Sequence, residues 1–202
     1  ESIGAGIDDA YIAELKKQVK HQDAIDAAAK DLKIVYTPLH GTGNIPARRI
    51  LKELGFENVY VVKEQELPDG EFPTVSYPNP EAAEAFELGL ALAKEVDADI
   101  VLATDPDADR LGVRVKDKDG EYHTLPGNMS GCLLADYEIG QKKELDGGLP
   151  EDGKFIKTIV TTNMAYAIAK YYNVDLIECL TGFKFIGQQI LGFETSGKGE
   201  YL

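Results

Sequence analysis

Short apolar runs alternate with stretches of helical pattern along most of the chain. Three runs rich in β-branched residues predict buried strands, "KIVYTPL" (33–39), "NVYVVKE" (58–64) and "ADIVLAT" (98–104). Between them, Asn44 and Pro46 predict the start of a helix that ends at Gly55. Asn79 and Pro80 predict the start of a second helix, "EAAEAFELGLALAKEV" (81–96).

The pattern then predicts a hairpin and a second strand–helix series. The hairpin covers "LGVRVKDKDGEYHTL" (111–125), with its turn at Asp119 and Gly120. The second series has a helix at 127–143, a strand at 155–160, a helix capped by Thr162, a strand at 174–180 and a helix from Phe185. The final segment, 192–202, is predicted to be a flexible connector.

Alternation of this kind implies βαβ units around parallel strands. We therefore predict an α/β fold with two consecutive three-layer α/β domains, whose sheets are mixed and mainly parallel. The expected domains are residues 1–125 and 126–202, the second incomplete at its C-terminus. Because the chain begins with Glu1 and stops at Leu202 in a strand-like segment, we expect a piece of a longer protein.

Composition is that of a globular protein: 202 residues, of which 44% are hydrophobic and 28% charged. The net charge of −14 argues against nucleic acid or a membrane surface as a partner. No apolar run approaches the roughly 18 residues of a membrane span, and no signal peptide is visible. Cys132 and Cys179 lack metal-ligand spacing, so we expect free thiols in a cytoplasmic protein.

The strongest chemical signal is "ATDPDADRLG" (103–112), where three aspartates alternate after a predicted strand. Alternate residues of an extended segment point to one side, so Asp105, Asp107 and Asp109 are expected to converge. Carboxylate oxygens suit Mg²⁺, and ligands of α/β proteins gather at the carboxyl ends of strands. We predict that these three aspartates bind Mg²⁺.

Other interpretations of this loop fit less well. An EF-hand would need Gly and Glu where the chain has Arg110 and Lys116, and a helix before the loop. A phosphatase with Asp105 as nucleophile would need Thr where the chain has Asp109. A polar, solvated turn and a Ca²⁺-binding module without chemistry both stay open.

An arginine beside a metal site indicates an anion between the two. Phosphate can bridge a metal ion and a guanidinium, so Arg110 is expected to contact a phosphoryl group. The alternative is that Arg110 only neutralises the aspartates.

Two further turns could bind ligands. "PLHGTGN" (38–44) could cradle an anion or be a tight turn, and His40 could be a ligand or satisfy local backbone groups. In "LTGFKFIG", Thr181, Gly182 and Lys184 could contact a sugar or phosphate, or could form only a helix cap.

Taken together, "TPLHGTGN", "PDGEFPTVSYPNPE", "ATDPDADRLGV", "LPGNMSGCLLADY" and "TGFKFIG" resemble the α-D-phosphohexomutase family, closest to bacterial phosphoglucomutase/phosphomannomutase. Members have four domains. The resemblance implies that 1–125 is the second domain, carrying the metal loop, and that 126–202 is the third.

The resemblance implies an isomerase of carbohydrate metabolism that acts by phosphoryl transfer between C1 and C6 of a hexose phosphate. A phosphoserine in the first domain and a sugar bisphosphate intermediate take part. Asp105, Asp107 and Asp109 become Mg²⁺ ligands, and Arg110 lies near the transferring phosphoryl group. Thr181, Gly182 and, with less support, Lys184 meet the sugar phosphate.

The chain departs from the family in lacking the serine motif of the first domain and the phosphate-binding loop of the fourth. The family's sugar-selecting "EES" segment is expected after Leu202, so Glu194 and Ser196 of "FETSG" receive no role. We expect this piece to be inactive without the first and fourth domains. The preferred sugar is open, and a phosphopentomutase of the same family is an alternative.

Overall fold

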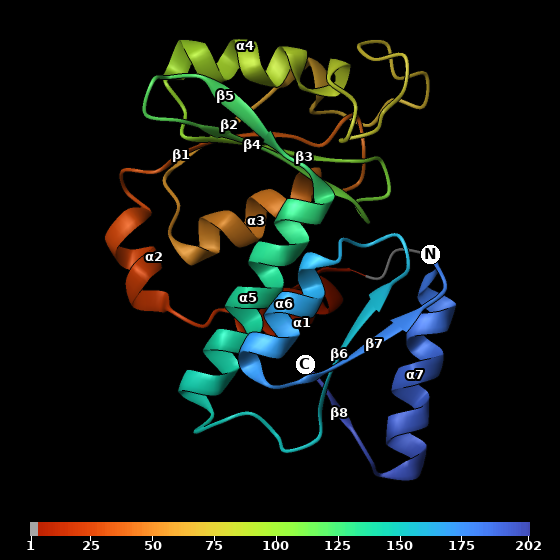
Figure 1. The fold of residues 1–202 in the computed structure, drawn as a ribbon. Helices are drawn as coiled ribbons and strands as arrows, with labels where there is room; N and C mark the ends of the chain where they lie inside the picture. Colours follow the sequence, from red (N-terminus) through yellow and green to blue (C-terminus); the bar gives the residue numbers. More distant parts are fainter. Residues whose placement is uncertain (1–3) are drawn as a thin grey trace. The chain divides into compact units, whose positions relative to one another are not determined.

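A computed structural model describes residues 4–202, and the chain divides into two compact units, Glu1–Gly127 and Asn128–Leu202 (Figure 1). Each unit is a sheet with helices on both faces, so the predicted α/β class is confirmed. Among the described residues, no helix has both the length and the apolar character needed to cross a lipid bilayer.

The first unit contains a five-stranded sheet in the order β2-β1-β3-β4-β5. Its strands are β1 (Lys33–Thr37), β2 (Asn58–Val61), β3 (Ile100–Thr104), β4 (Leu111–Lys116) and β5 (Tyr122–Leu125). β1 pairs in parallel with β2 and β3, whereas β4 pairs antiparallel with β3 and β5. The mixed sheet and the predicted hairpin are therefore both present.

Helices cover both faces of this sheet. The helices of this unit are α1 (Ala5–Lys16), which packs on α3, α2 (Gln22–Ala28), α3 (Asn44–Leu54) and α4 (Glu87–Val96), with short 3₁₀ helices η1 (Lys63–Gln65) and η2 (Glu84–Phe86). α3 and α4 lie on opposite faces (Figure 1). α4 packs closely, because a Cβ at Gly89 would be 3.1 Å from Val101 Cγ1 in the core.

The predicted helix start at residue 81 is wrong. Asn79 Oδ1 accepts a hydrogen bond from the Glu81 amide at 2.9 Å, and residues 81–83 form a turn before η2. Asn79 therefore stabilises a turn rather than the start of a helix. The turn brings Phe86, which is fully buried, onto the sheet.

The second unit has an all-parallel sheet in the order β7-β6-β8. Its elements are α5 (Gly127–Leu145), β6 (Gly153–Thr158), α6 (Met164–Tyr172), β7 (Asp175–Cys179), α7 (Phe183–Ser196) and β8 (Glu200–Tyr201). Its core comprises Ile139, Ile168, Ala169 and Val174.

The connector predicted at 192–202 is wrong. α7 continues to Ser196, Gly197 ends it with a φ of 64°, and β8 then pairs with β6. The Gly199 amide donates a hydrogen bond to Asp152 Oδ2 at 2.5 Å. Polar and glycine residues that indicate a connector here instead terminate a helix, which glycine at C′ does commonly.

Candidate metal centre

The aspartate loop connects β3 to β4, which are adjacent antiparallel strands. The Ala108 amide donates to Asp105 O at 2.9 Å, and Ala108 has a φ of 60°, so the segment is a tight turn. The premise of an extended segment is therefore wrong. The curvature of the turn brings the carboxylates together instead.

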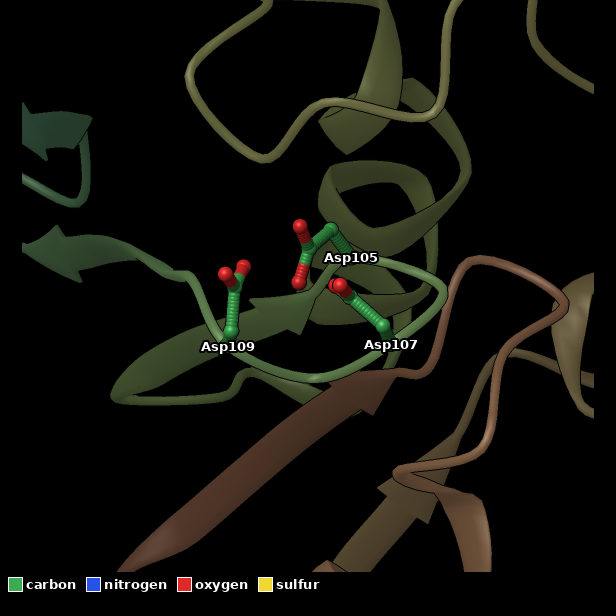
Figure 2. A group of neighbouring side chains, drawn as sticks. All are labelled: Asp105, Asp107 and Asp109. Carbon is green, nitrogen blue, oxygen red and sulfur yellow. The ribbon is translucent and has the colours of Figure 1, made fainter. Parts of the chain in front are cut away.

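The three carboxylates nevertheless converge. Asp105, Asp107 and Asp109 each offer an oxygen, and these atoms lie within 4.8 Å of one another. Figure 2 shows their side chains pointing toward one another from a single loop. Asp105 is 1% exposed, whereas the other two are exposed. An all-oxygen donor set with exposed members fits a hard divalent cation that keeps open positions.

Arg110 pairs with the buried member of the set. Its guanidinium Nε lies 2.7 Å from Asp105 Oδ2, and its amide donates to Asp105 Oδ1 at 3.0 Å. Burial is the largest influence on the Asp105 pKa and raises it, but the hydrogen bonds and charge of Arg110, together with a hydrogen bond from Asp109, outweigh burial and lower this pKa. Arg110 therefore pairs with one aspartate, while 47% of its side chain is still exposed.

The charges of Asp107 and Asp109 are not balanced by a close cation within the loop. Desolvation, followed by the charges of Asp107 and Asp105, raises the pKa of Asp109. Arg110 Nε is farther from Asp109 Oδ1, at 3.7 Å, than from Asp105. Repulsion among like charges is what a bound cation would relieve.

His40 is not available as a ligand in this structure. Its Nδ1 lies 3.2 Å from Leu67 O and its Nε2 2.8 Å from Thr74 Oγ1, and the residue is buried. Both ring nitrogens are thus taken up by neighbouring loop residues. The interpretation that His40 satisfies local groups agrees with these contacts.

The predicted ligand residues of the second unit share one turn. Gly182 has a φ of 127° and immediately precedes α7, at the carboxyl end of β7. Thr181 and Lys184 are exposed, and Lys184 Nζ lies 4.9 Å from the centre of the Phe185 ring. The turn therefore presents a hydroxyl and a cation to solvent.

Sequence reasoning missed an ion pair in this unit between a buried lysine and an exposed glutamate. Lys157 Nζ lies 2.5 Å from Glu178 Oε2 and donates to the carbonyls of Thr158 and Thr161, and its side chain is 1% exposed. It links the carboxyl ends of β6 and β7. The lysine inside the apolar run "FIKTIV" could have indicated this pair, because a buried lysine needs a partner of opposite charge.

Comparisons with known proteins identify the relationship. Residues 9–120 match the model described as phosphoglucomutase/phosphomannomutase, alpha/beta/alpha domain II, and residues 126–200 match domain III. This chain belongs to the α-D-phosphohexomutase family. The predicted resemblance, and its extent over the second and third domains, are confirmed.

Relatives in sequence and structure agree. A probable phosphomannomutase of Haemophilus influenzae is 39% identical over 189 residues, covering 92% of this chain and 36% of the relative. A phosphoglucomutase of Staphylococcus epidermidis is 42% identical over 160 residues, covering 79% of this chain and 28% of the relative. The phosphohexomutase chain thus spans about a third of the length of these relatives.

Solved structures share the fold. A phosphoglucomutase/phosphomannomutase family protein from Burkholderia thailandensis aligns with a TM-score of 0.68 and 22% identity, covering 96% of this chain and 37% of that one. A putative phosphomannomutase from Thermus thermophilus aligns with the same TM-score and 20% identity, covering 96% and 40%.

Proposed function

We propose that this chain is the central part of a Mg²⁺-dependent phosphoglucomutase/phosphomannomutase. The whole enzyme would interconvert hexose 1-phosphate and hexose 6-phosphate through a phosphoserine and a hexose bisphosphate. The observation that carries the proposal is the convergence of three carboxylates beside Arg110. It occurs in a chain that the models of domains II and III of this family match over residues 9–120 and 126–200.

Asp105, Asp107 and Asp109 are the residues that would hold the metal ion. Their oxygen donors suit Mg²⁺, which would supply positive charge to the transferring phosphoryl group. A protein of the same fold, Aspergillus fumigatus N-acetylphosphoglucosamine mutase, was solved in complex with GlcNAc-6P and magnesium, with 17% identity and a TM-score of 0.54. The presence of magnesium in a protein of this fold supports Mg²⁺ as the choice of metal.

Arg110 would contact the phosphoryl group. Asp105 anchors its Nε, and the partly exposed guanidinium would donate to phosphate oxygens. In the second unit, Thr181, Gly182 and Lys184 would bind the sugar phosphate through a hydroxyl, a backbone amide and an ammonium group. Positioning and charge stabilisation are the main contributions that phosphoryl transfer requires of a protein.

The phosphoserine and the second phosphate loop belong, in this proposal, to first and fourth domains that relatives carry outside the matched region. The piece alone would then be inactive, and the second unit would be incomplete at its C-terminus. A cytoplasmic location and the choice between hexose and pentose phosphates stay predictions, as does the boundary near residue 125.

Activity of the full-length parent tests the proposal. We expect conversion of glucose 1-phosphate or mannose 1-phosphate to the 6-phosphate, dependent on Mg²⁺ and abolished by chelation. The triple variant of Asp105, Asp107 and Asp109 to Asn should lose turnover, and the 202-residue chain alone should show none. Full-rate turnover by the triple variant would overturn the proposal, and a preference for ribose phosphate would favour the pentose alternative.

A further inference from the structure

Residues 39–43, which follow β1, pack directly against the aspartate loop. The Thr42 amide donates to Pro106 O at 2.8 Å, and Thr42 Oγ1 donates to the same oxygen at 3.0 Å. A Cβ at Gly41 would overlap Pro106 Cα and lie 2.6 Å from Pro106 O. Only glycine allows this approach, and Pro106 separates two of the three aspartates.

A second glycine permits the same close packing deeper in the unit. A Cβ at Gly43 would be 2.7 Å from both Tyr36 OH and Thr104 Oγ1. These two hydroxyl groups are hydrogen-bonded to each other at 2.8 Å directly before the aspartate loop. Gly41 and Gly43 of "PLHGTGN" thus allow the segment to pack closely against Thr104 and the loop after β3.

Buried hydrogen bonds stabilise the backbone of residues 39–43. Leu39 and His40 adopt φ angles of 46° and 59°, which are unfavourable for residues with a Cβ. The His40 amide donates to Gln65 O at 2.9 Å, and the Leu39 amide donates to Thr37 Oγ1 at 3.1 Å. Such a conformation persists only where its surroundings over-determine it, and it clusters at functional sites.

We propose that Thr42 is a positioning residue for the metal loop. Thr42 donates two hydrogen bonds to the carbonyl oxygen of Pro106. These bonds set the orientation of the peptide that joins Pro106 to Asp107. The effect on metal affinity rests on the metal assignment above. The proposal also states that Thr42 orders the aspartate loop when no metal is bound.

The test replaces only the hydroxyl group. Thr42→Val keeps the side-chain shape and the backbone amide, Thr42→Ser keeps the hydroxyl, and Thr124→Val makes the same change on exposed β5. Because outer-shell partners typically contribute about 10- to 100-fold to metal affinity, we expect Thr42→Val to bind Mn²⁺ about tenfold more weakly than wild type. Thr42→Ser and Thr124→Val should bind as wild type does.

A second readout needs no metal. The amides of Ala108 and Arg110 both donate to Asp105, so their hydrogen exchange reports the order of the loop. We expect faster exchange at these two amides in Thr42→Val, with an unchanged urea midpoint for the chain. A general loss of stability would instead lower the midpoint and accelerate exchange throughout the sheet.

The outcomes separate the two proposals. Unchanged exchange and unchanged Mn²⁺ affinity in Thr42→Val would overturn the positioning role, as would equal defects in Thr42→Ser. If the wild-type chain takes up no Mn²⁺, the metal assignment fails, and exchange at Ala108 and Arg110 still decides whether Thr42 orders the loop. Gly41→Ala should produce a larger defect than Thr42→Val in the same exchange measurement.

Discussion

Arg110 holds Asp105 at both carboxylate oxygens, through its backbone amide at 3.0 Å and its guanidinium Nε at 2.7 Å. The buried aspartate is thereby neutralised within the protein, while Asp107 and Asp109 are exposed. The loop therefore has one carboxylate whose charge Arg110 balances and two exposed carboxylates without such a balance, and the oxygens of all three converge.

The Arg110–Asp105 pair is expected to stabilise the first unit. Arg110→Met should lower the urea midpoint, because the buried Asp105 carboxylate loses its guanidinium partner. Asp105→Asn combined with Arg110→Met should be more stable than Arg110→Met alone, since no buried charge then remains. A double-mutant cycle measures this coupling, and a value of zero would show that the pair contributes nothing.

Asp107→Asn should weaken Mg²⁺ binding without unfolding the chain. Removing one of three neighbouring charges relieves repulsion, so stability without metal should be unchanged or higher. Asp107 is also one cause of the raised pKa of Asp109, after desolvation, so this pKa should move down toward its ordinary value. Calorimetry and carboxyl NMR titration measure the two effects.

Asp119→Asn, in the β4–β5 turn, is the matched control for this change. It should alter neither Mg²⁺ affinity nor the pKa of Asp109. Equal Mg²⁺ affinity of wild type and Asp107→Asn would remove Asp107 from the ligand set.

Gly112→Ala should destabilise the first unit by about 1–3 kcal/mol, because overpacking forces neighbouring groups to move. A Cβ at Gly112 would overlap Pro80 O and lie 2.9 Å from Phe86 Cζ. Gly70→Ala is the control, since nothing lies within 4 Å of a Cβ there. Urea unfolding compares them, and equal midpoints would contradict the close packing of the 68–80 loop on β4.

The Lys157–Glu178 pair should make the stability of the second unit depend on pH. The hydrogen bond from Lys157 is the largest cause that lowers the pKa of Glu178 below its ordinary value of 4.5. Because the folded-state pKa is lowered, the stabilisation is complete above the ordinary pKa and is lost as pH falls through the lowered one.

Urea midpoints measured between about pH 6 and about pH 3 test this dependence around the ordinary glutamate pKa. Glu178→Gln should remove the part of the acid-induced loss that comes from this pair. Identical pH profiles of wild type and Glu178→Gln would show that the pair does not titrate with folding.

Local patterns in the sequence were enough for most elements. The apolar runs predicted β1, β3, β6 and β7, and Asp119 with Gly120 predicted the hairpin of β4 and β5. Strand periodicity and turn chemistry are local properties, which explains this agreement. The helix start predicted from Asn79 was wrong because an asparagine side chain can cap a helix or stabilise an isolated turn.

The candidate site was predicted only as a set of donor groups. Asp105, Asp107, Asp109 and Arg110 could be identified because they are adjacent in the chain. Their actual arrangement required the turn at Ala108 and the choice of Asp105 as the partner of Arg110. Which carboxylate is buried depends on packing around the loop, which spacing does not reveal.

By itself, the sequence determined most of the strands and helices between residues 33 and 180, the family and the three neighbouring aspartates of the candidate metal loop. Only the tertiary structure decided that Thr42 meets Pro106 and that Lys157 meets Glu178. The physical reason is that these partners are brought together by the pairing of strands and the packing of loops. Such contacts join residues far apart in the chain, where local propensity carries no information about the partner.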